Sequence, residues 1–202
     1  MATTWTHLAA RALVRPLIGT GVTPNHLTTL RLVTGLMACA AVALGTPAGA
    51  LWGGILWLIS AFLDRADGEL ARIGDMMSAQ GHAYDYFADV LVNSLVFAAA
   101  GIGARHSWLG VWAAPLGVIA TAAMLVCWIV GEWYQKLEGS GRKAYEGRWG
   151  FDMDDGLYLI APLIWFGLMS FVVLGAALAT SVMAVLIIFR YRRLKAERRL
   201  AG

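Results

Sequence analysis

Long apolar segments separated by short polar ones run through most of this chain. A helix needs about 20 apolar residues to cross the hydrocarbon core of a bilayer. The first four windows of this kind are residues 27–44, 51–63, 86–104 and 108–131. An uncharged segment at 157–189 would form a helix of about 50 Å, which is too long for one span and somewhat short for two. We predict two short helices there, with a break near Gly175.

The pattern therefore predicts an all-α integral membrane protein with six transmembrane helices. The second window is short, so we expect its helix to continue into the charged residues that follow it. Before the first span, apolar residues recur at helical spacing, while His7, Arg11 and Arg15 share a polar face. This is typical of an interfacial amphipathic helix. The predicted division is residues 1–20 for the interfacial helix, 21–193 for the six-helix transmembrane domain and 194–202 for a basic tail.

The composition agrees with a membrane location. Hydrophobic residues make up 59% of the chain and charged residues 14%, whereas soluble domains carry about a quarter charged residues. This excludes a disordered segment and an ordinary soluble domain. The net charge is +3, but the basic residues lie beside apolar segments and form no stripe with interleaved aromatic residues. We therefore expect no nucleic-acid partner. Cys39 and Cys127 lie in separate apolar segments, so we expect neither a disulfide nor a metal site from them.

The basic residues predict the orientation of the spans. With six spans, Arg105 is the only one of the 16 lysine and arginine residues on the side opposite the termini. Cytoplasmic loops carry the excess of such residues, so we expect both termini to be cytoplasmic and the membrane to be a bacterial inner membrane. All 13 acidic residues fall on that same side, which predicts a cytoplasmic active site. The basic tail would also contact anionic lipid of the bilayer.

Four aspartates cluster where the second span ends and the third begins. Asp64 and Asp67 are three residues apart, and Asp85 and Asp89 are four apart, so each pair projects from one face of a helix. A short turn can bring all four carboxylates together. They need compensating cations, because repulsion and desolvation would otherwise protonate some of them. Mg²⁺ or Mn²⁺ is the natural choice, whereas helix capping would explain only one or two of the four.

Small and basic residues accompany the aspartates. Gly68 and Gly81 would let a bulky ligand or another backbone approach closely, and helix packing is the alternative explanation for them. Arg72 offers planar, bidentate donors suited to a phosphate group. This set of residues therefore predicts a phosphate-containing substrate at the metal site.

The spacing resembles the signature of the CDP-alcohol phosphotransferase family, also called the CDP-alcohol phosphatidyltransferases. The matching positions are Asp64, Asp67, Gly68, Ala71, Arg72, Gly81, Asp85 and Asp89. Residues 23–31 resemble the start of the family's first transmembrane helix. Six spans with cytoplasmic termini also match the family's architecture, and its members commonly form homodimers.

Members of this family transfer a substituted phosphate from a CDP-linked donor to an alcohol and release CMP. The resemblance implies that Asp64, Asp67 and Asp85 are the principal ligands of two divalent ions. It implies that Asp89 contributes to the second ion and accepts the proton of the alcohol. The positions implied to line the donor nucleotide and diphosphate are Gly68, Arg72, Ser78, Asn25 and Arg31. Arg31 alone could equally extend its side chain to the membrane interface.

The sequence leaves alternatives for the donor substrate and for the class of protein. CDP-diacylglycerol with a small alcohol acceptor is the expected substrate pair, and transfer from a CDP-linked polar alcohol to a lipid acceptor is the alternative. A cation transporter would place its carboxylates near the midplane, between interrupted helices in corresponding halves, and no such pair of helices is evident. A purely structural membrane protein would leave four clustered carboxylates unexplained.

Two charged sets before the fifth span bear on the acceptor. The basic set comprises Lys136, Arg142, Lys143 and Arg148, and the acidic set comprises Asp152, Asp154 and Asp155. The first would suit a phosphorylated acceptor, and the second an uncharged polyol or an amino alcohol. Because the acidic set adjoins a rigid helix, it would position an acceptor better than a glycine-rich loop. The alternative is that the basic set is a solvated loop and that Asp154 and Asp155 are carboxylates at a helix N-terminus, and the resemblance to the family favours phosphorylated acceptors. On the argument from the rigid helix we expect an acceptor without a phosphate of its own.

Overall fold

The structure is a computed structural model that describes residues 5–139 and 153–201. Within these ranges the secondary structure is entirely helical. The principal helices are α1 (Trp5–Val14), α2 (Pro24–Ala43), α3 (Pro47–Ile73), α4 (Ala79–Gly103), α5 (Ala113–Glu138), α6 (Ile160–Trp165) and α7 (Met169–Ala201). A 3-10 segment, Met153–Leu159, leads into α6. The predicted all-α class is therefore confirmed.

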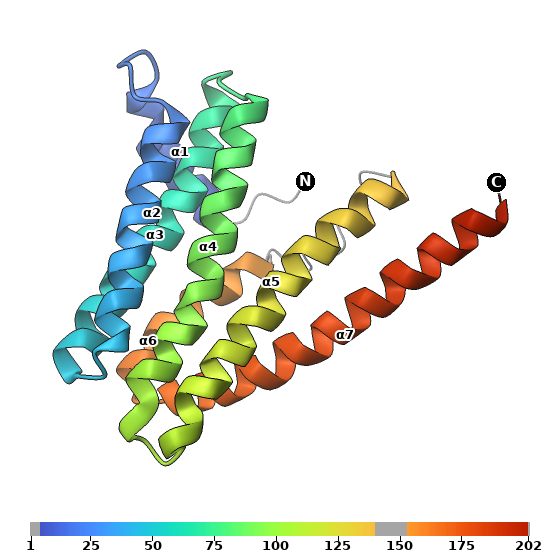
Figure 1. Ribbon diagram of the computed structural model, residues 1–202. Helices are drawn as coiled ribbons and strands as arrows, with labels where there is room; N and C mark the ends of the chain where they lie inside the picture. The colour runs from blue at the N-terminus through green and yellow to red at the C-terminus, as the bar shows by residue number, and fades with distance from the viewer. Residues whose placement is uncertain (1–4, 140–152, 202) are drawn as a thin grey trace.

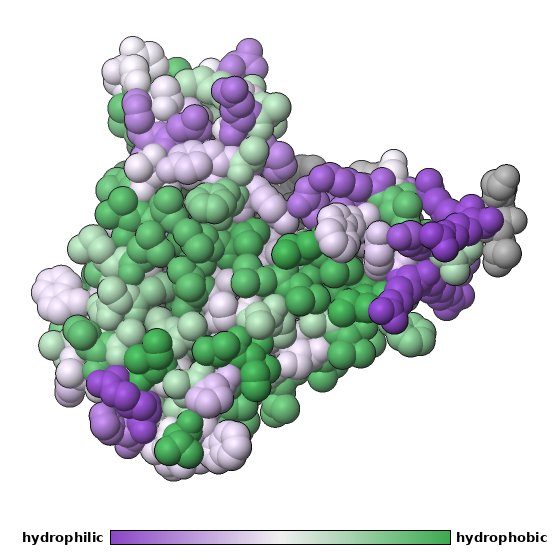
Figure 2. Space-filling view, in the orientation of Figure 1, coloured by the Kyte–Doolittle hydropathy of each residue, from purple (hydrophilic) through white to green (hydrophobic). Residues whose placement is uncertain are grey.

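Helices α2 to α5 alternate in direction along the chain, and α7 runs in the same direction as α5 (Figure 1). In this view α2 and α4 run downwards beside α3, which runs upwards, while α5 and α7 run side by side and lean away from the other three at their upper ends. Helices α2, α3, α4, α5 and α7 are long and apolar enough to cross a membrane. Figure 2 shows the corresponding apolar surface across the middle of the molecule, with hydrophilic residues gathered at its ends. The protein is thus a multi-pass membrane protein with five candidate spans among the described residues.

The predicted break near Gly175 is wrong. Gly175 lies inside the continuous helix α7, and the chain turns instead at Gly167, whose φ is 74°. Glycine adopts this left-handed conformation without the steric penalty that a Cβ would add. The turn is closed by hydrogen bonds from the amides of Gly167 and Leu168 to the carbonyls of Ile164 and Leu163. As a result α6 is short, and the apolar helical segment before the turn, 156–165, is too short to cross a bilayer.

Three side-chain bonds hold this short segment against α3. Trp57 Nε1 donates to the carbonyl of Leu157 at 2.7 Å, and Tyr158 Oη donates to that of Ala61 at 3.0 Å. Trp165 Nε1 donates to the carbonyl of Leu51 at 3.2 Å. Residues of the segment therefore meet α3 in reverse order, which makes the two antiparallel neighbours.

Capping residues set where α2, α3 and α4 begin. Thr23 and Thr46 each precede a proline at the first helical position, where the missing amide hydrogen costs nothing. Ser78 Oγ accepts from the amide of Gly81 at 3.0 Å at the start of α4. Helix α3 runs on to Ile73, which confirms the predicted continuation of the second span into charged sequence. Asp64 and Asp67 therefore lie on a regular helix.

The opposite ends of α2 and α4 meet at Arg105. Its Nη1 donates to the carbonyls of Ala43 and Ile102 at 3.0 and 2.9 Å, and its Nη2 donates to that of Leu44 at 3.2 Å. The last carbonyls of a helix have no partner within the helix. One guanidinium thus satisfies the ends of two helices at once.

Close backbone approach between α4 and α5 generates a stability prediction. A Cβ added to Gly101 would lie 2.6 Å from the carbonyl oxygen of Ala113 and 2.9 Å from Cα of Gly117. These are backbone atoms, so Gly101→Ala should lower the free energy of unfolding by about 1–3 kcal/mol through overpacking. At Gly175 a Cβ would meet nothing within 4 Å, so Gly175→Ala should leave stability equal or slightly higher. Thermal unfolding in one detergent compares the two, and equal melting temperatures would contradict this packing.

Candidate metal centre

Three of the four predicted aspartates converge between α3 and α4. Asp64, Asp67 and Asp85 each place an oxygen within 4.8 Å of the oxygens of the other two. Asp67 is 3% exposed, and its Oδ2 accepts from Thr28 Oγ1 at 2.7 Å. The turn between α3 and α4 thus brings three of the four carboxylates into one group, whereas the spacing predicts that all four converge.

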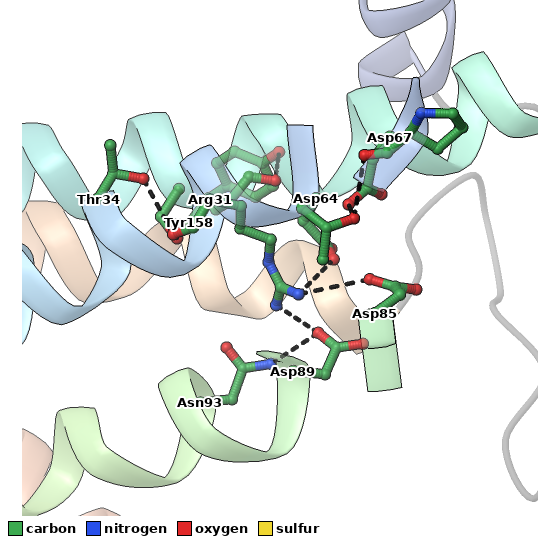
Figure 3. Close-up of polar contacts among 12 residues, drawn as sticks. Arg31, Thr34, Asp64, Asp67, Asp85, Asp89, Asn93 and Tyr158 are labelled. Carbon is green, nitrogen blue, oxygen red and sulfur yellow. Dashed lines mark hydrogen bonds and ion pairs between the residues drawn. The ribbon is translucent and has the colours of Figure 1, made fainter. Parts of the chain in front are cut away.

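Arg31 lies among these carboxylates (Figure 3). Its Nη1 lies 3.4 Å from Asp64 Oδ1 and 3.5 Å from Asp85 Oδ1, and its Nη2 forms an ion pair with Asp89 Oδ1. The side chain is only 2% exposed, so the alternative in which it extends to the membrane interface is wrong. The physical reason is charge: four clustered carboxylates attract a guanidinium more strongly than water or lipid headgroups do in this partly buried setting.

Asp89 is linked to the other aspartates through Arg31. Its Oδ1 accepts from Arg31 Nη2 and from Asn93 Nδ2, the latter at 3.3 Å. Its Oδ2 has no partner among residues 5–139 and 153–201. One oxygen of Asp89 is therefore held in place, and the other is available to a substrate.

The donor set fits a divalent cation. Three of the four carboxylates contact the single guanidinium of Arg31, which cannot balance the charge of all four when they are ionised. Three carboxylate oxygens within one small region are the ligands that Mg²⁺ and Mn²⁺ prefer. The chemistry of the side chains, and the burial of Asp67 in particular, makes a bound cation the simplest compensation.

Four of the five predicted donor-binding residues form two groups near the carboxylates, whereas Arg31 is paired with the aspartates themselves. On α3, a Cβ added to Gly68 would lie 3.5 Å from Arg72 Nη2, so the guanidinium of Arg72 lies over this glycine. At the starts of α2 and α4, a Cβ added to Gly81 would lie 3.0 Å from Ser78 Oγ and 3.3 Å from Asn25 Oδ1. Ser78 also caps α4, and this structural role alone would account for a serine there.

Sequence reasoning missed three polar side chains at the site. Thr28 holds Asp67, Asn93 holds Asp89, and Glu69 contacts Arg72 at 2.7 Å. Helical spacing would have identified two of them, because Thr28 lies three residues before Arg31 and Asn93 lies four residues after Asp89.

Most of the predicted acceptor sets lies outside the described residues. The positions concerned are Arg142, Lys143, Arg148 and Asp152, together with the side chains of Asp154 and Asp155. The remaining member, Lys136, forms an exposed ion pair with Glu132 at 2.6 Å on α5. The acceptor expectation therefore stays a prediction.

Comparison with known proteins gives the family. The model of the CDP-alcohol phosphatidyltransferase family matches residues 21–189. The chain belongs to this family. Membership confirms the resemblance that the aspartate spacing indicates, and it makes the protein a membrane transferase of phospholipid synthesis. It also favours the transferase over the cation transporter and the structural protein.

Two crystal structures of the phosphatidylinositol phosphate synthase of Mycobacterium tuberculosis share the fold. The structure with CDP-DAG bound is 18% identical, has a TM-score of 0.67 and covers 93% of each chain. The structure in complex with manganese and citrate is 20% identical, has a TM-score of 0.63 and covers 92% of this chain and 88% of that chain. A search of curated proteins found no significant match.

The bond from Thr28 to Asp67 generates a prediction about metal affinity. Thr28→Val keeps the shape of the side chain and removes the donor, so Mn²⁺ should bind about 10- to 100-fold more weakly, as when other metal-supporting bonds are lost. Thr34→Val is the control, because Thr34 on the same helix bonds only to backbone carbonyls of its own helix. Calorimetric titration of Mn²⁺ measures both variants. Equal affinity in the two would show that the bond from Thr28 to Asp67 does not support metal binding.

Proposed function

We propose that the protein transfers the phosphatidyl group of CDP-diacylglycerol to the hydroxyl of a small alcohol and releases CMP. The observation that carries the proposal is the site itself: three convergent carboxylates, with Asp89 beside them holding one oxygen free, in a chain of the CDP-alcohol phosphatidyltransferase family. The likeness in fold to a synthase crystallised with CDP-DAG supports this choice of donor.

Asp64, Asp67 and Asp85, with a contribution from Asp89, are the residues proposed to hold two divalent ions, Mg²⁺ or Mn²⁺. When bound, such ions supply positive charge that neutralises the diphosphate of the donor and the departing CMP. The synthase of similar fold was crystallised with manganese, which supports the choice of ion. Arg31 would hold the carboxylates in register, since it contacts residues of both α3 and α4.

Asp89 is proposed as the general base. Its free Oδ2 accepts the proton of the incoming hydroxyl, while Arg31 and Asn93 hold Oδ1. The hydroxyl oxygen then forms a bond to the phosphorus that carries diacylglycerol. The bond from that phosphorus to the CMP oxygen breaks, and CMP leaves with the electron pair.

The donor would lie along α3 and the starts of α2 and α4. Arg72, over Gly68, would donate to the diphosphate. Asn25 and Ser78, which approach each other at Gly81, would contact the nucleotide. The role of Gly81 in this proposal is to leave room for that approach.

Six passes and an interfacial N-terminal helix remain the proposed topology. The segment 153–165 runs antiparallel to α3, so it continues the alternation of directions and would form part of the fifth pass. Leu8 and Leu13 on α1 are 55% and 61% exposed, an apolar surface that the bilayer interface would cover. We propose cytoplasmic termini and active site in a bacterial inner membrane, and the division at residues 20 and 193.

The acceptor is the least determined substrate. We propose an alcohol without a phosphate of its own, on the argument from the acidic set before the fifth span. The competing acceptor is inositol phosphate, which the name of the synthase of similar fold suggests. Transfer from a CDP-linked polar alcohol to a lipid acceptor would require a donor without acyl chains, and assays with both donor classes separate it from the proposal.

Release of CMP from CDP-diacylglycerol tests the function. Purified protein with Mn²⁺ and a panel of plain and phosphorylated alcohols should release CMP, and Asp89→Asn should lower turnover by at least about 100-fold because the base is lost. Binding of CMP with Mn²⁺ should persist in that variant. Asp75→Asn, at an exposed position in the α3–α4 turn, is the control with normal turnover.

Two outcomes would contradict the assignment of Asp89. Near-normal turnover in Asp89→Asn would remove its role as base. Loss of CMP binding as complete as in Asp64→Asn would place Asp89 among the essential metal ligands instead.

Labelling of single cysteines tests the orientation. Cys39 and Cys127 are first replaced by alanine, and cysteine is placed at Met77, which is 75% exposed, or at the exposed His106. The excess of basic residues on the side of Met77 predicts that this side is cytoplasmic. A membrane-impermeant thiol reagent should therefore label position 106 in cells with a permeable outer envelope, and position 77 only after the cells are opened. The reverse pattern would put the active site outside.

A further inference from the structure

Glu69 is a buried carboxylate that joins two helices beside the metal centre. Its side chain is 2% exposed. Oε1 lies 3.0 Å from His7 Nδ1 and 2.7 Å from Arg72 Nη2, and Oε2 accepts from Arg11 Nε at 2.9 Å. His7 and Arg11 belong to α1, whereas Glu69 and Arg72 belong to α3. The N-terminal helix is therefore bonded to the same carboxylate as the arginine assigned to the donor diphosphate.

The two partners of His7 define the direction of its hydrogen bonds. A guanidinium can only donate, so His7 Nε2 accepts from Arg65 Nη1 at 3.1 Å. Nδ1 then carries the proton and donates to Glu69 Oε1. Val14 of α1 also packs with Leu70 of α3 in a small apolar cluster. Directional bonds and apolar packing together fix α1 on the face of α3 that carries Glu69.

Glu69 holds Arg72 through only one of the nitrogen atoms of its guanidinium. Glu69 accepts from Nη2 only, and neither Nη1 nor Nε has a partner in the part of the chain that the structure describes. The side chain is 48% exposed, and its Nη2, Nη1 and Cζ atoms lie 3.5 to 3.8 Å from where a Cβ on Gly68 would be. The remaining donors of Arg72 are thus available to an anion on the side of Gly68.

We propose that Glu69 is a positioning residue for Arg72, and that α1, through His7 and Arg11, sets the affinity of the donor site. This inference rests on the proposed function, because Arg72 acts there on the donor diphosphate. An arginine side chain that is already held loses less conformational freedom when the donor binds. A merely structural anchor for α1 would change stability and leave the KM for the donor unchanged.

Steady-state kinetics of the full-length protein in lipid nanodiscs test the role of Glu69. In Glu69→Gln the KM for CDP-diacylglycerol should rise about tenfold, while kcat and the KM for the acceptor change less than about twofold. Because Glu69 acts through Arg72, Glu69→Gln combined with Arg72→Ala should be no worse than Arg72→Ala alone. Glu197→Gln is the control: Glu197 forms an exposed ion pair with Arg193 on α7, and its loss should leave every constant unchanged.

The contribution of α1 is measured in a variant that keeps Glu69 and Arg72. His7→Ala combined with Arg11→Ala should raise the donor KM about fivefold with kcat unchanged. If Glu69→Gln does not fold, this double variant still tests the inference. A normal donor KM in it would overturn the role of α1.

Four further results would decide against the inference or its basis. A lower kcat at normal donor KM in Glu69→Gln, or effects of Glu69→Gln and Arg72→Ala that add, would overturn the positioning role of Glu69. Wild-type protein that turns over CDP-diacylglycerol, with a normal donor KM in every variant, would overturn this inference alone. Wild-type protein that neither binds CMP with Mn²⁺ nor releases it would overturn the proposed function and this inference together.

Discussion

The arrangement of α2, α3 and α4 depends on the ion pairs between Arg31 and the aspartates. Two of these carboxylates are on α4 and one is on α3, and α2 supplies the cation that all three contact. Breaking a buried pair of this kind leaves uncompensated charge, which is strongly destabilising. Helix α2 supplies none of the predicted principal metal ligands. Its Arg31 is nevertheless what allows the carboxylates of α3 and α4 to lie together.

Arg31 compensates only part of that charge, and the remainder is what gives the site its chemistry. One guanidinium among four carboxylates leaves an excess of negative charge at the edge of the membrane. Thr28, on the same helix, donates to Asp67, so α2 supports each carboxylate without neutralising the cluster. A fully neutralised cluster would have no affinity for divalent cations, and an uncompensated one would be partly protonated. One guanidinium for four carboxylates lies between these two limits.

Spacing along single helices predicted much of the site, because a helix fixes its own faces. The continuation of α3 through Asp64 and Asp67, and the opposition of the two aspartate pairs, both follow from positions within one short stretch of sequence. The place of Arg31 could not be predicted in this way, since it depends on how α2 packs against its neighbours. That packing is close because Gly35 has no side chain where Val92 and Ser60 approach, and no local pattern reports such a distant contact.

The error at Gly175 has a related cause. Two glycines interrupt the long apolar segment, and hydropathy does not distinguish a glycine inside a helix from one that ends it. Gly167 ends α6 because the segment before it is bonded to α3 through Trp57, Tyr158 and Trp165. These tertiary hydrogen bonds set the position of the turn. The spacing of apolar residues along the chain does not reveal such bonds.

Arg105 shows how a folding requirement can coexist with the rules of membrane insertion. In the proposed topology it is the one basic residue on the side opposite the termini, where a charge opposes the usual sorting of loops. In the folded protein its guanidinium, although exposed, donates to three carbonyls at the ends of α2 and α4. Its five N–H donors allow one side chain to bond the ends of both helices at once. In that topology the other 15 basic residues lie on the side of the termini, so the charge of Arg105 leaves the overall asymmetry large.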